Sequence, residues 1–232
     1  GIVTRVVLQL QPKAGSSHTA LCGLSSYESA TQLLVELKRS LGSGLTGFEL
    51  MWDNYYHKVL ATVTDLTDPL EGKFPFYLLV EYKDNNAELG AERFESALFQ
   101  QLELGVIVDA VIAKSHQDAA VFWQIRDGIG ELLQVLGPVS NQDVSLPISE
   151  IGTFAKDLKE RLVAKYANID LLLFGHIGDN NLHAVAYTGL EEDKFKIIHF
   201  FICVMGIIFS IFDKQVFILA ATEMSCKFKE FF

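Results

Sequence analysis

The sequence contains few cysteines and no pattern of a disulfide-stabilised protein. Its three cysteines, Cys22, Cys203 and Cys226, are odd in number and far apart among 232 residues. This spacing argues against a disulfide framework and favours reduced thiols in an intracellular compartment. We expect Cys22 to be a small residue of the core.

Basic residues are also scarce and do not cluster. The chain has 19 Lys and Arg against 29 Asp and Glu, a formal net charge of −10. A protein that follows phosphate groups needs clustered Lys and Arg, so this composition argues against a nucleic-acid partner. The chain is 50% hydrophobic and 11% aromatic, which excludes a disordered chain and is sufficient for one or two folded domains.

The first residues contain neither an initiator Met nor a basic segment followed by an apolar one. They already have the alternating pattern of a strand, predicted at residues 3–10. No targeting segment is therefore visible. We expect that the chain begins within a longer protein.

An apolar run lies near the other end, from Ile197 to Phe212. It is shorter than the roughly 20 residues that span a bilayer, contains His199 and lacks an amphipathic period. We therefore divide the chain into a domain at residues 1–194 and an atypical apolar tail at 195–232. Three interpretations of the tail remain open: a membrane span, which the run's length argues against, a buried helix that completes the sheet, and a non-native ending.

Strand-like and helix-like segments alternate along the domain. We predict strands near 3–10, 46–50, 75–83, 106–112, 140–146, 169–176 and 182–188, and helices near 26–41, 51–60, 88–104, 115–136 and 148–167. This string fits an α+β fold with a mostly antiparallel, ferredoxin-like sheet covered by helices, although a parallel α/β fold would give a similar string. The loop around Pro69 and Gly72 is predicted to divide two βαβ-like halves.

The segment with the clearest chemical content is Gly-His-Ile-Gly-Asp-Asn-Asn-Leu-His, residues 175–183. Asp179 and Asn180 suit a two-residue hairpin turn between the flanking strands. Such a turn would place His176 opposite His183, with Cβ atoms roughly 4.5–5.5 Å apart. The two imidazoles could then share one metal, provided that a third ligand joins them. Asp179 lies at the turn and is a poor candidate for this ligand.

The spacing alone is equally consistent with a pair of histidines on a half-buried sheet that binds no metal. A similar alternative exists for Arg126 in the predicted helix 115–136. By itself, an arginine at that place is most simply a solvated helix residue paired with Asp127 or Glu131.

The histidine segment resembles the Gly-His-x-Gly-Asp-Gly-Asn-x-His signature of the FAD-linked oxidases, specifically the C-terminal domain of the vanillyl-alcohol oxidase-like group that includes D-2-hydroxyglutarate and D-lactate dehydrogenases. Two further stretches are similar to this family in the same order. They are the strand at residues 1–10 and Asp-Val-Ser-Leu-Pro-Ile-Ser at 143–149. The resemblance covers roughly residues 1–194, so the chain resembles a fragment, and it favours the antiparallel fold.

The resemblance implies an enzyme that oxidises a small D-2-hydroxy acid to the 2-oxo acid, located in mitochondria or in the bacterial cytoplasm. FAD would be bound mainly by a domain that this chain lacks. His176 and His183 would bind a divalent metal, Zn or Mn, which holds the substrate hydroxyl and carboxylate. The motif Trp123-x-x-Arg126 is similar to the family helix whose Arg binds the substrate.

Several positions differ from the family pattern. Asn180 replaces a Gly, which the turn tolerates because Asn readily adopts left-handed geometry. Asn141 and Val185 replace a Lys and an Asn that serve diacid substrates, which favours a monocarboxylate such as lactate over hydroxyglutarate. The family's Glu-His-Gly segment, which supplies the third metal ligand and a His near the flavin, does not occur after His183. No catalytic residue is therefore identified.

In principle His199 and Glu223 could replace the missing ligand, but nothing in their sequence setting argues for it. Two interpretations follow. The chain is either the substrate- and metal-binding part of an FAD-dependent D-2-hydroxyacid dehydrogenase, or a non-catalytic α+β module that binds a metal or another subunit and lacks flavin.

Overall fold

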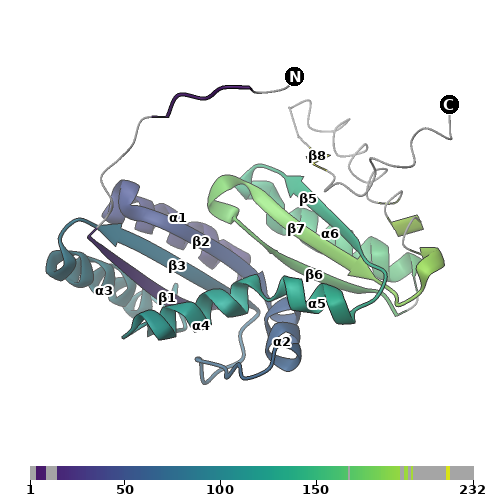
Figure 1. Cartoon of the computed structure of the whole chain (residues 1–232), viewed down its shortest axis with the longest axis horizontal. Helices are drawn as coiled ribbons and strands as arrows, with labels where there is room; N and C mark the ends of the chain where they lie inside the picture. Colours follow the sequence, from purple (N-terminus) through teal and green to yellow (C-terminus); the bar gives the residue numbers. More distant parts are fainter. Residues whose placement is uncertain are drawn as a thin grey trace.

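In the computed structural model, the protein forms one antiparallel sheet with helices on both faces (Figure 1). The structure describes residues 4–8, 15–166, 168–193, 196–197, 200 and 218–219. The strand order is β4-β1-β3-β2-β6-β7-β5-β8. The strands are β1 (Ser16–Leu24), β2 (Leu45–Trp52), β3 (Phe76–Asp84), β4 (Asp109–Ile112), β5 (Ser140–Ser145), β6 (Asp170–Gly175), β7 (Asn181–Tyr187) and β8 (Ile218–Leu219).

The sheet consists of two halves that repeat one topology. In the N-terminal half, residues 16–112, β1 pairs with β3 and β4, and β3 pairs with β2. In the C-terminal half, residues 140–219, β5 likewise pairs with β7 and β8, and β7 pairs with β6. Each is the ferredoxin-like arrangement of four strands. The two halves join edge to edge through β2 and β6, where Leu50 pairs with Gly175 and Met51 with Phe174.

The helices divide between the two faces of the sheet. They are α1 (Tyr27–Leu41), α2 (Asp53–Thr62), α3 (Ala87–Glu103), α4 (His116–Asp127), α5 (Ile129–Val135) and α6 (Ile148–Lys165). Buried residues of α1, α3 and α6 form one core cluster with the sheet, and those of α2, α4 and α5 form a second cluster on the opposite face. In Figure 1, α4 and α5 cross in front of the sheet, and α1 and α6 lie behind it.

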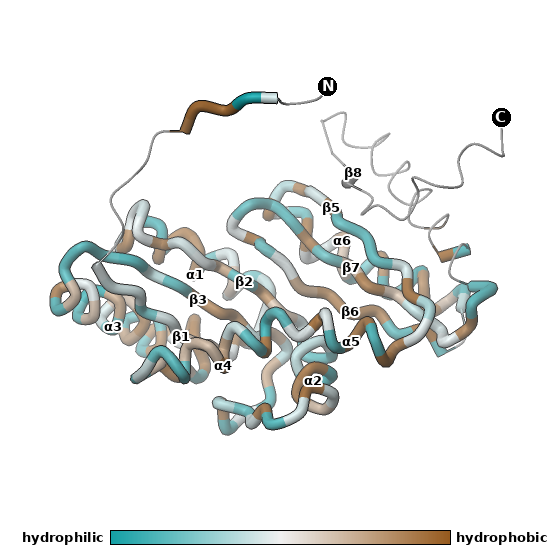
Figure 2. Tube along the Cα trace, viewed as in Figure 1, coloured by the Kyte–Doolittle hydropathy of each residue, from teal (hydrophilic) through white to brown (hydrophobic). Residues whose placement is uncertain are grey.

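The alternation of side chains between the two faces of the sheet explains why helices pack on both faces. Phe48 and Leu50 of β2 enter the α1 side, whereas Met51 enters the α2 side. Hydrophobic residues follow most of β6 (Figure 2). Because successive side chains of a strand point to opposite faces, β1, β2, β3, β6 and β7 each contribute residues to both cores.

The predicted α+β, ferredoxin-like antiparallel fold is confirmed. Most predicted elements have a counterpart within a few residues. One helix predicted at 115–136 is in fact two, α4 and α5, divided at Gly128. A Cβ at Gly128 would lie 2.5 Å from Cγ1 of Val59 in α2, so this glycine allows the close approach of the two elements.

Two predictions about the first half were wrong. Residues 4–8, the described part of the predicted first strand, form no strand, and β1 lies instead at Ser16–Leu24. The loop around Pro69 and Gly72 does not divide the molecule, because it connects α2 to β3, and β3 pairs with β2 inside the same half. The chain passes between the halves through α4 and α5.

Candidate functional site

The segment 175–183 does not form the predicted two-residue hairpin. After β6 ends at Gly175, residues Ile177–Asp179 form a short 3-10 turn before β7 begins. His183 consequently pairs with Phe174 rather than with His176. The hairpin register was predicted from turn residue types alone, and the longer turn shifts the pairing by two residues.

Two residues give this turn its shape. A Cβ at Gly175 would lie 2.4 Å from the carbonyl oxygen of Asn181, so only glycine fits against the returning strand. Asn180 has φ +63° and ψ +23°, the left-handed geometry that the sequence predicted for it. Asn tolerates this region better than most residues, because its short polar side chain fits there.

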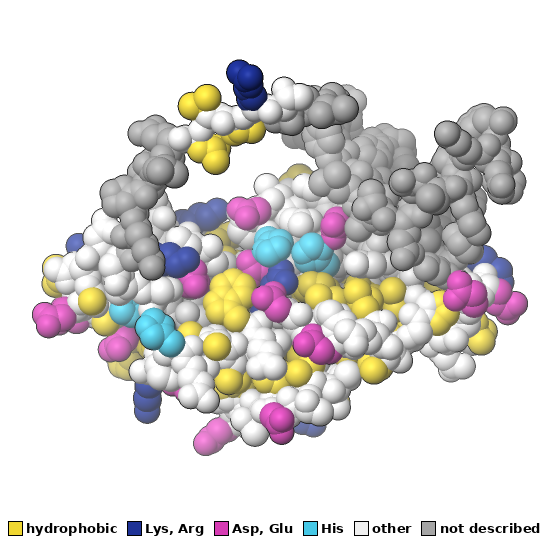
Figure 3. Space-filling view, in the orientation of Figure 1, with side chains coloured by type: hydrophobic (Ala, Val, Ile, Leu, Met, Phe, Trp, Pro, Cys, Tyr) yellow, Lys and Arg dark blue, Asp and Glu magenta, His cyan; other side chains and the backbone are white. Residues whose placement is uncertain are grey.

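The two histidines nevertheless lie side by side. Their ring centroids are 5.4 Å apart and the rings are nearly perpendicular, at 78°. In Figure 3 two imidazoles lie together near the middle of the visible face, with basic and acidic side chains beside them. His176 reaches this position from the residue just beyond β6, and His183 from inside β7.

His183 is bonded to a carboxylate of the neighbouring strand. Its Nδ1 contacts Oδ1 of Asp143, which pairs with it across β5 and β7. Its ring also packs on Phe174, with centroids 4.9 Å apart. Burial lowers the pKa of His183 below its ordinary value, although Asp143 acts in the opposite direction. The neutral imidazole, the form that can bind a metal, is therefore favoured.

His176 has a corresponding arrangement on the other side of the site. Its Nδ1 lies 2.7 Å from Oε1 of Glu49 in β2, and its Nε2 lies 3.1 Å from Nη2 of Arg126. The β2–β6 pairing explains the first contact. Because Leu50 pairs with Gly175, the next residues along the two strands, Glu49 and His176, meet at the end of β6.

Arg126 lies in the last turn of α4 and is only 7% exposed, so it is not the solvated helix residue of the simpler interpretation. Its Nε donates to Oε2 of Glu49 at 2.9 Å, and its Nη1 donates to Oδ1 of the exposed Asp127 at 3.0 Å. Its guanidinium also lies over the ring of Phe174, 5.4 Å from the centroid. A buried charge requires such partners, and they hold the guanidinium in one place.

Tyr55 of α2 contacts both Arg126 and Phe174. Its hydroxyl donates to the carbonyl oxygen of Arg126 at 2.7 Å, and its ring stacks on Phe174 with centroids 4.2 Å apart. The site is therefore built from β2 and α2 of the N-terminal half, from α4 of the connection, and from β5, β6 and β7 of the C-terminal half.

Sequence reasoning missed Glu49 and assigned no role to Asp143. Glu49 is 5% exposed, and it is the one charged residue in the strand segment Gly-Phe-Glu-Leu-Met at 47–51. An acidic residue inside an otherwise apolar strand is a signal for a buried ion pair. Its partner could not be identified from the sequence, because Arg126 is distant in the chain.

The donor set of the two histidines fits part of a metal site. Each imidazole turns Nδ1 to a carboxylate and leaves Nε2 on the other side, the usual arrangement of histidine ligands. An ion on Nε2 of His176 would have to replace the hydrogen bond from Arg126. Within the described residues, no group of three or more His, Cys, Asp or Glu side chains is placed to hold a metal. His199 and Glu223 lie outside the described residues.

The two positions that depart from the family's diacid pattern face each other. Asn141 pairs with Val185 across β5 and β7, two residues along from the pair Asp143 and His183. Val185 is fully buried in the α2-side core, together with Phe174. This pair therefore contains one neutral amide and one apolar side chain, and no positive charge.

Two other predictions concern residues away from the site. Cys22 is fully buried, and burial raises the pKa of its thiol to about 12, so the prediction of a core residue is confirmed. Most of the apolar run 197–212 lies outside the described residues. No helix in the described part of the chain has both the length and the apolar character needed to cross a membrane.

Comparison with known families supports the resemblance seen in the sequence. The family model of FAD linked oxidases, C-terminal domain, matches residues 13–208. The chain belongs to this family. The proposed division between residues 1–194 and 195–232 remains a prediction.

Several curated relatives that the chain resembles are named as dehydrogenases of 2-hydroxy acids. The chain is 39% identical over 194 residues to mitochondrial D-2-hydroxyglutarate dehydrogenase of Arabidopsis thaliana, which covers 84% of this chain and 34% of that protein. It is 32% identical over 192 residues to a putative mitochondrial D-lactate dehydrogenase of Schizosaccharomyces pombe, covering 79% and 36%. A bacterial relative, D-2-hydroxyglutarate dehydrogenase of Stutzerimonas stutzeri, is 28% identical, covering 84% and 41%. The chain therefore spans only about a third of the length of the first two relatives.

Solved structures share the fold. A 4-ethylphenol oxidase from Gulosibacter chungangensis, complexed with isoeugenol, aligns with a TM-score of 0.52 and 9% identity over 82% of this chain and 44% of that one. A p-cresol methylhydroxylase with bound substrate aligns with a TM-score of 0.55 and 12% identity over 81% and 42%. At these identities, the likeness concerns the fold alone.

Proposed function

We propose that this chain is the substrate- and metal-binding part of an FAD-dependent dehydrogenase that oxidises a D-2-hydroxy acid to the 2-oxo acid. The observation that carries the proposal is the group of Arg126, His176 and His183, which the fold brings together from α4, the end of β6 and β7. The names of the relatives support the same class of substrate. An enzyme of this class would be located in mitochondria or in the bacterial cytoplasm.

Arg126 would bind the carboxylate of the acid. The described residues engage three of the five N–H donors of its guanidinium, through Nε, Nη1 and Nη2. Two donors on the terminal nitrogens are left for the substrate, and a guanidinium matches the two oxygens of a carboxylate. The contacts with Glu49 and Phe174 fix its orientation before the acid arrives.

His176 and His183 would hold a divalent ion, Zn or Mn, through Nε2, while Glu49 and Asp143 hold their Nδ1 atoms. A third ligand is required from residues outside the described part of the chain. FAD would be held mainly by another domain. When bound, the ion would supply a Lewis acid for the substrate hydroxyl, and FAD would supply the acceptor of the hydride from C2.

We propose a monocarboxylate such as D-lactate as the preferred substrate. A second carboxylate near Asn141 would lose water without gaining a positively charged partner, because Asn141 offers a neutral amide and Val185, its partner across β5 and β7, is apolar and fully buried. Leaving a carboxylate desolvated and unpaired is costly. D-2-hydroxyglutarate is the competing substrate, since several relatives carry its name.

The proposal can be tested by joining this chain to the FAD-binding domain and the Glu-His-Gly segment of a relative. Reduction of a dye should then depend on D-lactate, with a higher kcat/KM than for D-2-hydroxyglutarate. Arg126→Lys should lower kcat/KM at least about tenfold, because the ammonium cannot bind a carboxylate through two parallel hydrogen bonds. No activity with any 2-hydroxy acid would contradict the proposal and leave the non-catalytic module.

A further inference from the structure

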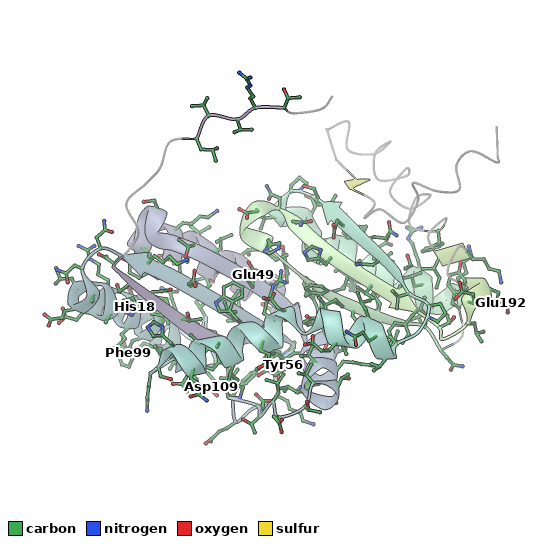
Figure 4. All side chains as sticks on the ribbon, in the orientation of Figure 1. His18, Glu49, Tyr56, Phe99, Asp109 and Glu192 are labelled. Carbon is green, nitrogen blue, oxygen red and sulfur yellow. The ribbon has the colours of Figure 1, made fainter. Side chains whose placement is uncertain are left out.

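Glu49 contacts both groups to which the proposed function assigns binding roles. Its Oε2 accepts from Nε of Arg126 at 2.9 Å, and its Oε1 lies 2.7 Å from Nδ1 of His176. The side chain is 7% exposed, in the middle of β2. One buried carboxylate therefore bridges the arginine and the first histidine of the site. Figure 4 labels Glu49.

This contact determines which nitrogen of His176 carries the proton. A carboxylate beside a guanidinium is ionised and can only accept hydrogen bonds. The proton of a neutral His176 must then be on Nδ1, and Nε2 keeps its lone pair. Nη2 of Arg126 lies beside both ring nitrogens, 3.1 Å from Nε2 and 3.5 Å from Nδ1, so the contact with Glu49 decides the tautomer.

We propose that Glu49 is a positioning residue that fixes the Nδ1–H tautomer of His176 and the orientation of the Arg126 guanidinium. With one oxygen on each group, it keeps Nε2 of His176 available to a metal and leaves donors on the terminal nitrogens of Arg126 for the substrate. The inference rests on the proposed function for the roles of these two residues. The geometry on which it stands is independent of it.

The substitution Glu49→Gln gives a sharp test, because an amide has one acceptor and one donor. Nε of Arg126 can only donate, so the amide oxygen should turn to Arg126 and the amide NH2 to Nδ1 of His176. Nδ1 would then have to accept, and the proton of His176 should move to Nε2. The expected result is a reversed tautomer and a loss of zinc affinity of about 10–100-fold, the usual cost of losing such a partner.

Asp127→Asn is the matched control. Asp127 contacts the same guanidinium through Nη1 at 3.0 Å. Its side chain is 61% exposed, and among its described contacts there is none with His176. This variant should keep the Nδ1–H tautomer. A general weakening of the fold in Glu49→Gln would lower the unfolding temperature, but it would not reverse a tautomer in the folded protein.

The tautomer is read from long-range ¹H–¹⁵N spectra of the full 232-residue chain without metal, with His176→Phe used for assignment. Nδ1–H in the wild type and in Asp127→Asn, with Nε2–H in Glu49→Gln, is the expected result. Nε2–H in the wild type, or Nδ1–H retained in Glu49→Gln, would overturn the inference. The wild-type spectrum decides even if Glu49→Gln does not fold.

Failure of the proposed function would have a different signature. Zinc and D-lactate are titrated, in parallel with the spectra, into the wild-type chain joined to the FAD-binding domain and Glu-His-Gly segment of a relative. Binding of neither would contradict the proposed function, whereas the tautomer of His176 in the metal-free protein would still decide the role of Glu49.

Discussion

The two halves of the sheet share a topology but differ in what connects their second and third strands. In the N-terminal half, α2 and a loop, residues 53–75, lie between β2 and β3. In the C-terminal half, only residues 176–180 lie between β6 and β7. The long connection places α2 against strands of both halves, β2 and β3 as well as β6, whereas the short turn contributes no helix.

Tyr77 and His183, which occupy corresponding positions in the two halves, differ in how deeply they are buried. Met51 and Phe174 pair with each other where the halves join, and their neighbours on the next strand are Tyr77 and His183. Tyr77 is fully buried beneath Tyr56 of α2, with ring centroids 3.6 Å apart. The side chain of His183 stays 19% exposed. The candidate site therefore lies where the second half lacks the cover that the first half has.

The largest effect is expected where one residue connects the halves. Arg126→Ala should lower the free energy of unfolding by about 3–5 kcal/mol, because it leaves the carboxylate of Glu49 buried without its partner. Urea unfolding measures this loss. Arg126→Lys should lose less, since it keeps the charge, and a loss below about 1 kcal/mol in Arg126→Ala would mean that Glu49 is not buried as described.

The comparison between Tyr77 and His183 can be tested directly. Tyr77→Ala should cost about 3–5 kcal/mol, as expected when a fully buried aromatic ring is removed. His183→Ala should cost about 1 kcal/mol, because the ring is partly exposed and small. The same denaturation assay serves for both. Equal losses would show that the two positions are covered to the same extent.

A smaller, pH-dependent effect concerns the contact between α2 and the C-terminal half. Asp170 of β6 accepts hydrogen bonds from Nζ of Lys58 at 2.8 Å and from the hydroxyl of Tyr187 at 2.7 Å. Burial acts to raise the pKa of Asp170, but these bonds outweigh it, and the pKa lies below its ordinary value of 3.8. The ionised form is therefore favoured in the folded protein.

Because the folded-state pKa of Asp170 is the lower one, its contribution is complete above about pH 4 and is lost as the pH falls through the folded value. Asp170→Asn should cost about 1 kcal/mol at pH 7, since the carboxylate is about one-third exposed and partly screened. Urea unfolding between pH 2 and 7 should show the two proteins converging in acid. A constant difference would contradict this account.

The smallest effect is expected at the short turn. Asn180→Gly should change the free energy of unfolding by no more than about 0.5 kcal/mol, because both residues accept φ +63°. Asn180→Val is the control and should cost about 1–2 kcal/mol, since a branched side chain is strained there. Thermal unfolding of both variants measures the difference. A large loss in Asn180→Gly would mean that the Asn180 side chain has another role.

The sequence predicted the fold class and the elements that have strong local signals. Helices such as α6, with apolar residues at helical spacing, were located within two residues at each end. The strand β1 was missed because Ser-Ser-His-Thr-Ala begins it without apolar alternation. Two similar halves were predicted, but their boundary was placed at the wrong loop, because the repeat exists in the strand pairing and not in similar residues.

The candidate site was predicted only in part, because some of its contacts depend on strand pairing and not on local patterns. His176, His183 and Arg126 were identified from local motifs and from the family resemblance. Glu49 was not, because its contacts depend on the pairing of β2 with β6, which local patterns do not specify. The hairpin register failed because the 3-10 turn depends on the close approach of Gly175 and Asn181.

The central proposal is that His176 and His183, at the short turn of the C-terminal half, bind a divalent metal together with a third ligand. A titration of Zn²⁺ or Mn²⁺ into the chain joined to the FAD-binding domain and Glu-His-Gly segment of a relative, with His183 intact and with His183→Ala, followed by calorimetry and by thermal unfolding, tests it most directly. The account predicts one ion per wild-type chain with a higher Tm on metal addition, and a clear loss of both in the variant, because an ion that binds only the folded state stabilises it. Equal metal uptake and an equal gain in Tm for the two proteins would contradict it.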